Sequence, residues 1–197
     1  MIRIALTGSI GMGKSTVAKM FERAGIPLFD ADAVVHQLQA PGGGLVGKIG
    51  EQFPGCVRCG TLDRECLAQI VLANPEKLSM LEAIVHPAVR EARDEFIATH
   101  AEAPALLFEI PLLFETGAEK DFDKVVVVSA PVEVQRRRVL ARTGMTAARL
   151  DSILSRQMPD SEKRARADFV IDTGADLSTT ESQVADILAC LGIPPSR

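Results

Sequence analysis

The sequence predicts an α/β protein with a three-layer core, in which a parallel β-sheet lies between two layers of helices. Short apolar runs at residues 2–6, 105–109 and 123–128 lack the alternation of a strand with one wet face. Such runs are typical of strands buried on both faces, which requires helices above and below the sheet. Segments with helical spacing separate these runs, as expected when crossover helices join parallel strands.

Residues 8–16 read Gly-Ser-Ile-Gly-Met-Gly-Lys-Ser-Thr and contain the motif G-x-x-x-x-G-K-[ST], filled by Gly8, Gly13, Lys14 and Ser15. The predicted strand 2–6 precedes this loop and a predicted helix follows it, which is the context that the motif needs. Backbone N–H groups of such a loop surround phosphates, the lysine reaches the β- and γ-phosphates, and the serine hydroxyl can bind Mg²⁺. The motif therefore predicts a core of the P-loop NTPase type that binds a nucleoside triphosphate with Mg²⁺.

The remaining elements follow in order along the chain. A second strand at 26–29 runs into Asp30 and Asp32, and the chain is then helical from 33 to about 101. This block is longer than one crossover helix, so we interpret it as an inserted substrate-binding region in which His86-Pro87 separates two helices. Further helices are expected at 131–142 and 146–157, a strand at 169–171, and a last helix capped by Ser178 with Glu181.

These elements predict three parts of the chain. The nucleotide-binding core is expected to comprise residues 1–32, 103–135 and 168–197, the helical substrate-binding region 33–102, and a helical lid 136–167.

Two carboxylates follow the second strand. Ligands of open parallel sheets bind beyond the carboxyl ends of the strands, so this edge should collect the phosphate loop, Asp30, Asp32 and Glu109. We predict Asp32 as the general base that accepts the proton of an attacking hydroxyl, and Asp30 as a helix cap or an indirect Mg²⁺ partner. The alternative is that both carboxylates only cap the next helix. For Glu109, a place around Mg²⁺ is as open as a role as a surface charge or an ion-pair partner.

A run of arginines indicates a lid. Gln135, Arg138 and Arg142 are spaced i, i+3, i+7 and share one helical face, just before a break at Thr143-Gly144. Guanidinium groups that close over a triphosphate would stabilise its charge in the transition state, so Arg138 and Arg142 are predicted to serve this role. Arg136 and Arg137 point off that face, and we interpret them as solvated charges.

The isolated histidine and the cysteines give weaker signals. By its position alone, His86 suits a helix-end cap better than an acid or base. Cys56 and Cys59 form a C-x-x-C pair with Cys66 close by, but a zinc site would need His86 or Cys190 as a fourth ligand. We expect these cysteines to be reduced and structurally incidental, with a metal or redox site as the alternative.

Composition excludes several classes of protein. The chain of 197 residues has a net charge of −4 and no Trp or Tyr, so no general nucleic-acid surface and no aromatic stacking platform is expected. No apolar stretch is long enough to span a bilayer, and the N-terminus enters the first strand directly, leaving no room for a signal peptide. We therefore expect a cytoplasmic protein with no membrane or nucleic-acid partner and no evident obligate protein partner.

Several segments in this order resemble the dephospho-CoA kinase family over nearly the whole chain. They are residues 8–16, Phe29-Asp30-Ala31-Asp32, residues 60–64, Ile84-Val85-His86-Pro87, Ile110-Pro111-Leu112-Leu113-Phe114-Glu115, Gln135 with Arg138 and Arg142, Arg156-Gln157 and residues 167–172. Two positions depart from the family pattern: Glu109, where Asp or an apolar residue is common, and Thr173, where Asn is more common. We expect Thr173 to affect only packing near the adenine.

The resemblance implies ATP-dependent phosphorylation of the ribose 3′-hydroxyl of dephospho-coenzyme A. It implies that Gly11, Met12, Gly13, Lys14, Ser15 and Thr16 bind ATP, that Asp32 is the catalytic base and that Arg142 is the lid arginine. It further implies that His86, Pro111, Leu112 and Leu113 line the acceptor site.

Two alternatives remain. Another small P-loop kinase, acting on a nucleoside monophosphate or a small alcohol, would share the core and the lid. A GTPase-type switch would need the guanine-reading sequence N-K-x-D, which the chain lacks.

Overall fold

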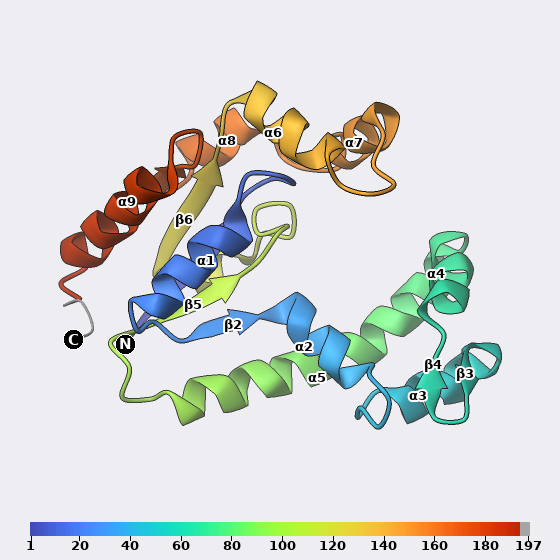
Figure 1. Ribbon diagram of the computed structural model, residues 1–197. Coiled ribbons are helices and arrows are strands. Elements are labelled where there is room, and N and C mark those ends of the chain that lie inside the picture. The colour runs from blue at the N-terminus through green and yellow to red at the C-terminus, as the bar shows by residue number, and fades with distance from the viewer. Residues whose placement is uncertain (194–197) are drawn as a thin grey trace. The chain divides into compact units, whose positions relative to one another are not determined.

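The computed structural model describes residues 1–193 and divides the chain into two compact units. One unit contains Met1–Phe29 and His100–Arg197, and the other contains Asp30–Thr99 (Figure 1). Each unit has its own hydrophobic core, so each is described separately.

The first unit is built on a five-stranded sheet with strand order β2-β5-β1-β6-β7. Its strands are β1 (Ile2–Thr7), β2 (Leu28–Asp30), β5 (Ala105–Glu109), β6 (Lys124–Ser129) and β7 (Phe169–Asp172). The pairs β1·β5, β1·β6 and β6·β7 are parallel, with Ile4 opposite Leu107 on one side and Lys124 on the other. The predicted class is therefore confirmed: a parallel sheet with flanking helices.

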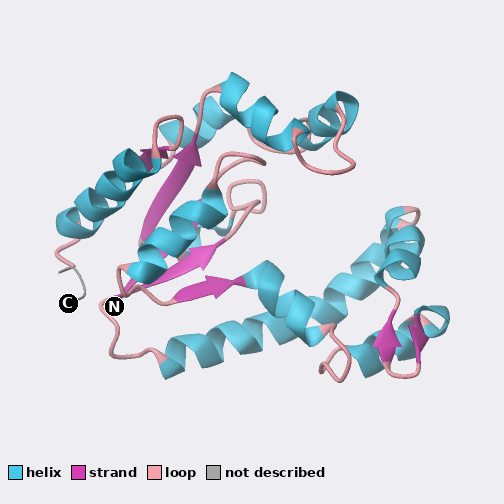
Figure 2. Cartoon of the chain, in the orientation of Figure 1, coloured by secondary structure: helices cyan, strands magenta, loops and turns pink. Residues whose placement is uncertain are grey.

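The two faces of this sheet are covered differently. Helices α1 (Lys14–Arg23) and α9 (Leu177–Cys190) pack on one face, where Phe21 and Ile187 meet strand residues such as Leu6 (Figures 1 and 2). On the other face an irregular segment after β5 places Leu113 and Phe114 against the sheet residues Ala5, Val125 and Val127.

The rest of this unit consists of short helices. They are the 3₁₀ turn η2 (Ala118–Asp121), α6 (Val132–Leu140), α7 (Ala147–Leu154) and α8 (Asp160–Ala165). Helix α9 begins earlier than expected: Asp176, and not Ser178, accepts the hydrogen bond from the Thr179 N–H that caps it. The predicted cap by Ser178 and Glu181 is therefore wrong, because the aspartate already satisfies this N–H group.

The second unit is mainly helical. It contains α2 (Ala31–Leu38), α3 (Val46–Gln52), the 3₁₀ turn η1 (Pro54–Cys56), the hairpin strands β3 (Val57–Arg58) and β4 (Thr61–Leu62), α4 (Arg64–Leu72) and α5 (Pro75–Thr99). Ile49, Phe53 and Leu67 lie at the centre of its core.

Helix α5 continues through Pro87, so the prediction of two helices separated at His86-Pro87 is wrong. Proline inside a helix removes a hydrogen bond and costs about 3 kcal/mol. Apolar side chains on both sides of this residue, Ile84 and Ala88 among them, pack against the same core and offset this cost.

A disulfide joins Cys56 of η1 to Cys66 of α4, which corrects the expectation that both are reduced. Cys59 and Cys190 are free and exposed. Residues 1–193 contain no group of three or more His, Cys, Asp or Glu side chains arranged to hold a metal ion, and none of their helices is long and apolar enough to cross a membrane.

Candidate nucleotide site

The loop between β1 and α1 has the backbone geometry of a phosphate-binding loop. Gly13 caps α1 with a φ of 92°, in the left-handed region that glycine adopts without strain. Gly8 passes so close to β6 that a Cβ atom there would lie 2.5 Å from the carbonyl oxygen of Val128. The free N–H groups at the start of α1 and the positive end of its dipole favour a phosphate.

The carboxylate of Glu109 holds the two side chains that follow the loop. Lys14 Nζ lies 2.7 Å and Ser15 Oγ 3.2 Å from the same Glu109 Oε1. Glu109 ends β5, next to β1, and is only 7% exposed. Of the alternatives for Glu109, the ion pair is thus observed and a surface charge is wrong, because the side chain is buried. The Ser15 hydroxyl belongs to the same cluster.

Hydrogen bonds from distant segments fix the loop backbone. Ile10 N donates to Gln157 Oε1 at 3.1 Å, and Ile10 O accepts from Gln135 Nε2 at 2.8 Å. Two residues further along the loop, Met12 O accepts from the Thr173 hydroxyl at 2.7 Å. The loop is therefore held in shape by α6, by the segment after α7 and by the segment after β7.

The two predicted lid arginines have different surroundings. Arg138 donates to the hydroxyl and carbonyl oxygens of Thr173, at 2.9 and 2.7 Å. Thr173 thus links an arginine to the phosphate loop, so the expectation that it affects only packing near adenine is wrong. Arg142 is exposed and follows α6 by two residues.

Two cavities open at the loop. One, of about 400 Å³, is lined by residues that include Lys14, Ser15, Pro111, Arg142 and Gln157. The other, of about 270 Å³, is lined by Arg138, Arg142 and Thr173 among others. Arg142 and the glycines at 11 and 13 border both cavities, so the loop lies between them.

Some residues of the segment after β5 border a cavity, and others lie in the core. Pro111 lines the larger cavity, and Leu112 is 43% exposed. Leu113 is fully buried against Ala5 and Val127. A buried side chain offers no surface to a ligand. The expectation that Leu113 lines the acceptor site is therefore wrong, and Leu113 instead supports the segment from the core.

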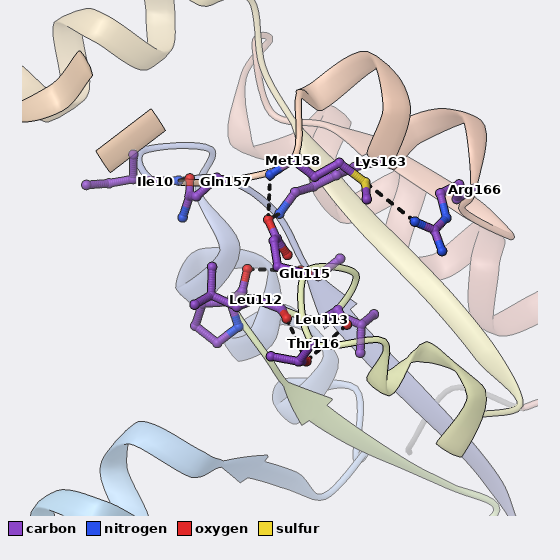
Figure 3. Close-up of polar contacts among 11 residues, drawn as sticks. Ile10, Leu112, Leu113, Glu115, Thr116, Gln157, Met158, Lys163 and Arg166 are labelled. Atoms are coloured by element: carbon purple, nitrogen blue, oxygen red, sulfur yellow. Dashed lines mark hydrogen bonds and ion pairs between the residues drawn. The ribbon is translucent and has the colours of Figure 1, made fainter. Parts of the chain in front are cut away.

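Glu115, at the end of this segment, anchors the chain that follows α7 (Figure 3). Its Oε1 accepts from Met158 N at 2.7 Å and lies 2.8 Å from Lys163 Nζ, a side chain with no exposed surface. Burial by itself raises the pKa of Glu115, but the Lys163 ammonium and the Met158 N–H outweigh it and hold the pKa below its ordinary value.

The other predicted residues belong to the second unit. Asp30 Oδ1 accepts from Ala33 N at 2.9 Å and caps α2. Asp32 lies in the first turn of the same helix with its side chain exposed. His86 is exposed in the middle of α5, so it does not cap a helix end.

Sequence reasoning missed the contacts that hold the loop. Gln157 carried a signal only as part of the Arg156-Gln157 motif, and neither Glu115 nor Lys163 was assigned a role. Glu115 and Lys163 are 48 positions apart, so no local pattern could pair them.

A phosphate-binding loop held in this way, on a parallel sheet with arginines on an adjacent helix, defines a P-loop kinase. The family model described as dephospho-CoA kinase matches residues 2–179. The chain therefore belongs to the dephospho-CoA kinase family.

Relatives and solved structures agree with this assignment. The chain is 54% identical to a dephospho-CoA kinase of Novosphingobium aromaticivorans over 95% of this chain and 94% of that protein. It is 51% identical to one of Brucella melitensis over 100% of this chain and 98% of the other.

Among solved structures, TT1252 from Thermus thermophilus superposes with a TM-score of 0.84 at 40% identity, covering 96% of this chain and 97% of that one. A dephospho-CoA kinase from Campylobacter jejuni gives 0.71 at 25% identity, with 95% of each chain covered.

Proposed function

We propose that this kinase transfers the γ-phosphoryl group of ATP to the ribose 3′-hydroxyl of dephospho-coenzyme A, giving coenzyme A and ADP, the last step of coenzyme A synthesis. One observation carries the proposal: a complete phosphate-binding loop lies in a chain about half identical, over its full length, to proteins named dephospho-CoA kinase. We further propose that the protein acts in the cytoplasm, where ATP is maintained. The proposed reaction needs no protein or nucleic-acid partner.

In the proposed reaction the 3′-hydroxyl oxygen forms a bond to the γ-phosphorus, and the bond from this phosphorus to the β,γ-bridging oxygen breaks. The hydroxyl proton passes to the Asp32 carboxylate and then to solvent, and ADP leaves. Gly8 and residues 11–16 hold the phosphates through backbone N–H groups and the side chains of Lys14 and Ser15. The Arg142 guanidinium neutralises charge on the transferring oxygens.

The donor set at the loop fits Mg²⁺. This ion prefers oxygen ligands and usually takes one or two from the protein, with phosphates and water completing its shell. The Ser15 hydroxyl and the Glu109 carboxylate, 3.2 Å apart, are oxygen donors of this kind. Ser15 would bind the ion directly and Glu109 would orient Ser15; when bound, the ion neutralises charge on the β- and γ-phosphates.

For the acceptor, we propose that His86, Pro111 and Leu112 contact dephospho-coenzyme A, with Leu113 supporting them from the core. Support comes from Pro111, which borders the cavity that contains Lys14, and from the exposed apolar surface of Leu112.

The experiment is a comparison of acceptors. The protein with Mg²⁺ and ATP is offered dephospho-coenzyme A, AMP, CMP or gluconate, and ADP formation is followed. We expect turnover with dephospho-coenzyme A to exceed the others by at least about 10³-fold, since AMP, CMP and gluconate lack the pantetheine arm, whose binding energy helps to position the reacting hydroxyl. Faster turnover with a nucleoside monophosphate or a small alcohol would favour the second candidate, another small P-loop kinase.

A further inference from the structure

Gln157 connects the phosphate-binding loop to the segment that follows α7. Its Oε1 accepts the hydrogen bond of Ile10 N, in the middle of the loop (Figure 3). Because a backbone N–H can only donate, this bond fixes which end of the amide faces the loop. The Nε2 group, with two hydrogens to donate, is therefore at the other end.

We expect the acceptor for this donor to be a ligand bound in the cavity of about 400 Å³. Gln157 lines it together with Lys14, Ser15 and Arg142. The lysine of such a loop reaches the β- and γ-phosphates, so this cavity is the one on the γ-phosphate side. The second cavity, beside Arg138 and Thr173, contains none of Lys14, Ser15 and Gln157 in its lining.

Gln157 is held in this cavity by its neighbour in the chain. Met158 N donates to Glu115 Oε1, and Lys163, five residues further on, forms an ion pair with the same oxygen. Glu115 is anchored in turn by the core, because Leu113 and Phe114 just before it are buried. The carboxylate thus ties both ends of the segment 158–163 to the segment after β5.

We propose that Gln157 donates a hydrogen bond from Nε2 to the terminal phosphate of ATP, and that Glu115 is a positioning residue that keeps Gln157 in place. The inference rests on the proposed function only in taking ATP as the nucleotide, and it does not depend on which acceptor the enzyme uses. It can therefore be tested by nucleotide binding alone, and failure of the acceptor assignment would not affect the result.

Glu119 provides a matched control. It pairs with Arg166 in the way that Glu115 pairs with Lys163, and the two carboxylates are similarly exposed, at 19% and 16%. Arg166 follows α8, whereas Met158 adjoins Gln157. Arg166 also contacts Met158 Sδ, at 3.8 Å, but the hydrogen bond from Met158 N to Glu115 does not involve Glu119. Loss of Glu119 therefore removes an ion pair of the same region and leaves this bond in place.

The experiment measures dissociation constants of ADP and of the non-hydrolysable analogue AMP-PNP by calorimetry with Mg²⁺. We expect Gln157→Ala to weaken AMP-PNP binding about 10-fold, the usual effect of losing one hydrogen bond to a charged group, and ADP binding less than about 2-fold. Gln157→Glu keeps an acceptor for Ile10 N–H but places a negative charge near the phosphate. It should bind AMP-PNP more weakly than Gln157→Ala, whereas a residue that only clamps the loop would be rescued by glutamate.

Glu115→Gln should weaken AMP-PNP binding about 3- to 10-fold and should add nothing in the Gln157→Ala background, because it acts through Gln157. Glu119→Gln should leave the ratio of AMP-PNP to ADP affinity unchanged. If Glu115→Gln does not fold, Glu115→Gln/Lys163→Met replaces it, since removing both charges leaves no buried cation unpaired.

Four results would overturn the proposal. Two concern Gln157: equal effects of Gln157→Ala on AMP-PNP and ADP, and full rescue by Gln157→Glu. Two concern Glu115: a Glu115→Gln effect that equals that of Glu119→Gln, and one that adds in full to that of Gln157→Ala.

Discussion

The Lys14 ammonium and the Glu109 carboxylate form a nearly buried ion pair, 2.7 Å apart, at the mouth of the phosphate-binding loop. The same carboxylate oxygen accepts from the Ser15 hydroxyl, so one acid orients the cation for the phosphates and the proposed Mg²⁺ ligand. Removing one partner of such a pair is costly because the other charge stays buried.

Glu109→Gln is therefore expected to lower kcat about 10- to 100-fold, since Lys14 and Ser15 lose the charged acceptor that orients them. The amide keeps the shape of the side chain but leaves the Lys14 ammonium without its counter-charge, so the Tm should also fall, by about 5–15 °C. Steady-state kinetics and a melting curve check this. Unchanged kcat would mean that Glu109 only neutralises Lys14 in the empty site.

Asp32→Asn should lower kcat about 10²- to 10⁴-fold, the range of a general base, with ATP affinity nearly unchanged. Asp30→Asn is the matched control, because asparagine caps a helix as well as aspartate does and should retain the hydrogen bond from Ala33 N. Kinetics of both variants decide the assignment. If Asp30→Asn were the more damaging change, the base would be Asp30.

Arg142→Ala should lower kcat far more than it weakens ATP binding, because a guanidinium on the transferring oxygens stabilises the transition state above the ground state. Arg142→Lys should restore only part of the loss, since the ammonium lacks the planar fork. Arg137→Ala, at an exposed position of α6 that lines neither cavity, should be nearly neutral. Equal losses at positions 137 and 142 would show that the arginine run is only a charged surface.

The Cys56–Cys66 disulfide predicts the number of reactive thiols. Protein prepared without reductant and denatured should titrate two thiols, those of Cys59 and Cys190, and four after reduction. Cys66→Ser should lower the free energy of unfolding by about 2–4 kcal/mol, because the link restricts the unfolded chain. Four titratable thiols before reduction would contradict the observed pairing.

Local patterns were sufficient to predict the sheet and the loop. The apolar run that became β6 has no wet face, and Gly8 to Ser15 form a motif of fixed spacing, so neither depended on distant residues. The helix through Pro87 could not be predicted, because the packing of Ile84 and Ala88 that offsets the cost of proline is a tertiary effect.

The supporting residues of the site were beyond sequence reasoning for the same reason. Thr173 and Met12, or Glu115 and Lys163, come together only when strands and helices have packed. The disulfide is similar: the C-x-x-C spacing drew attention to Cys56 and Cys59, whereas the fold of η1 against α4 brings Cys66 to Cys56.

The most direct test of the proposed reaction is the identity of its product. The protein is incubated with ATP, Mg²⁺ and dephospho-coenzyme A, and the products are separated and examined by mass spectrometry and phosphorus NMR. The account predicts one ADP for each acceptor that gains a phosphate, with the new phosphate on the ribose 3′-oxygen. ADP without a phosphorylated acceptor, or a phosphate on any other oxygen, would contradict it.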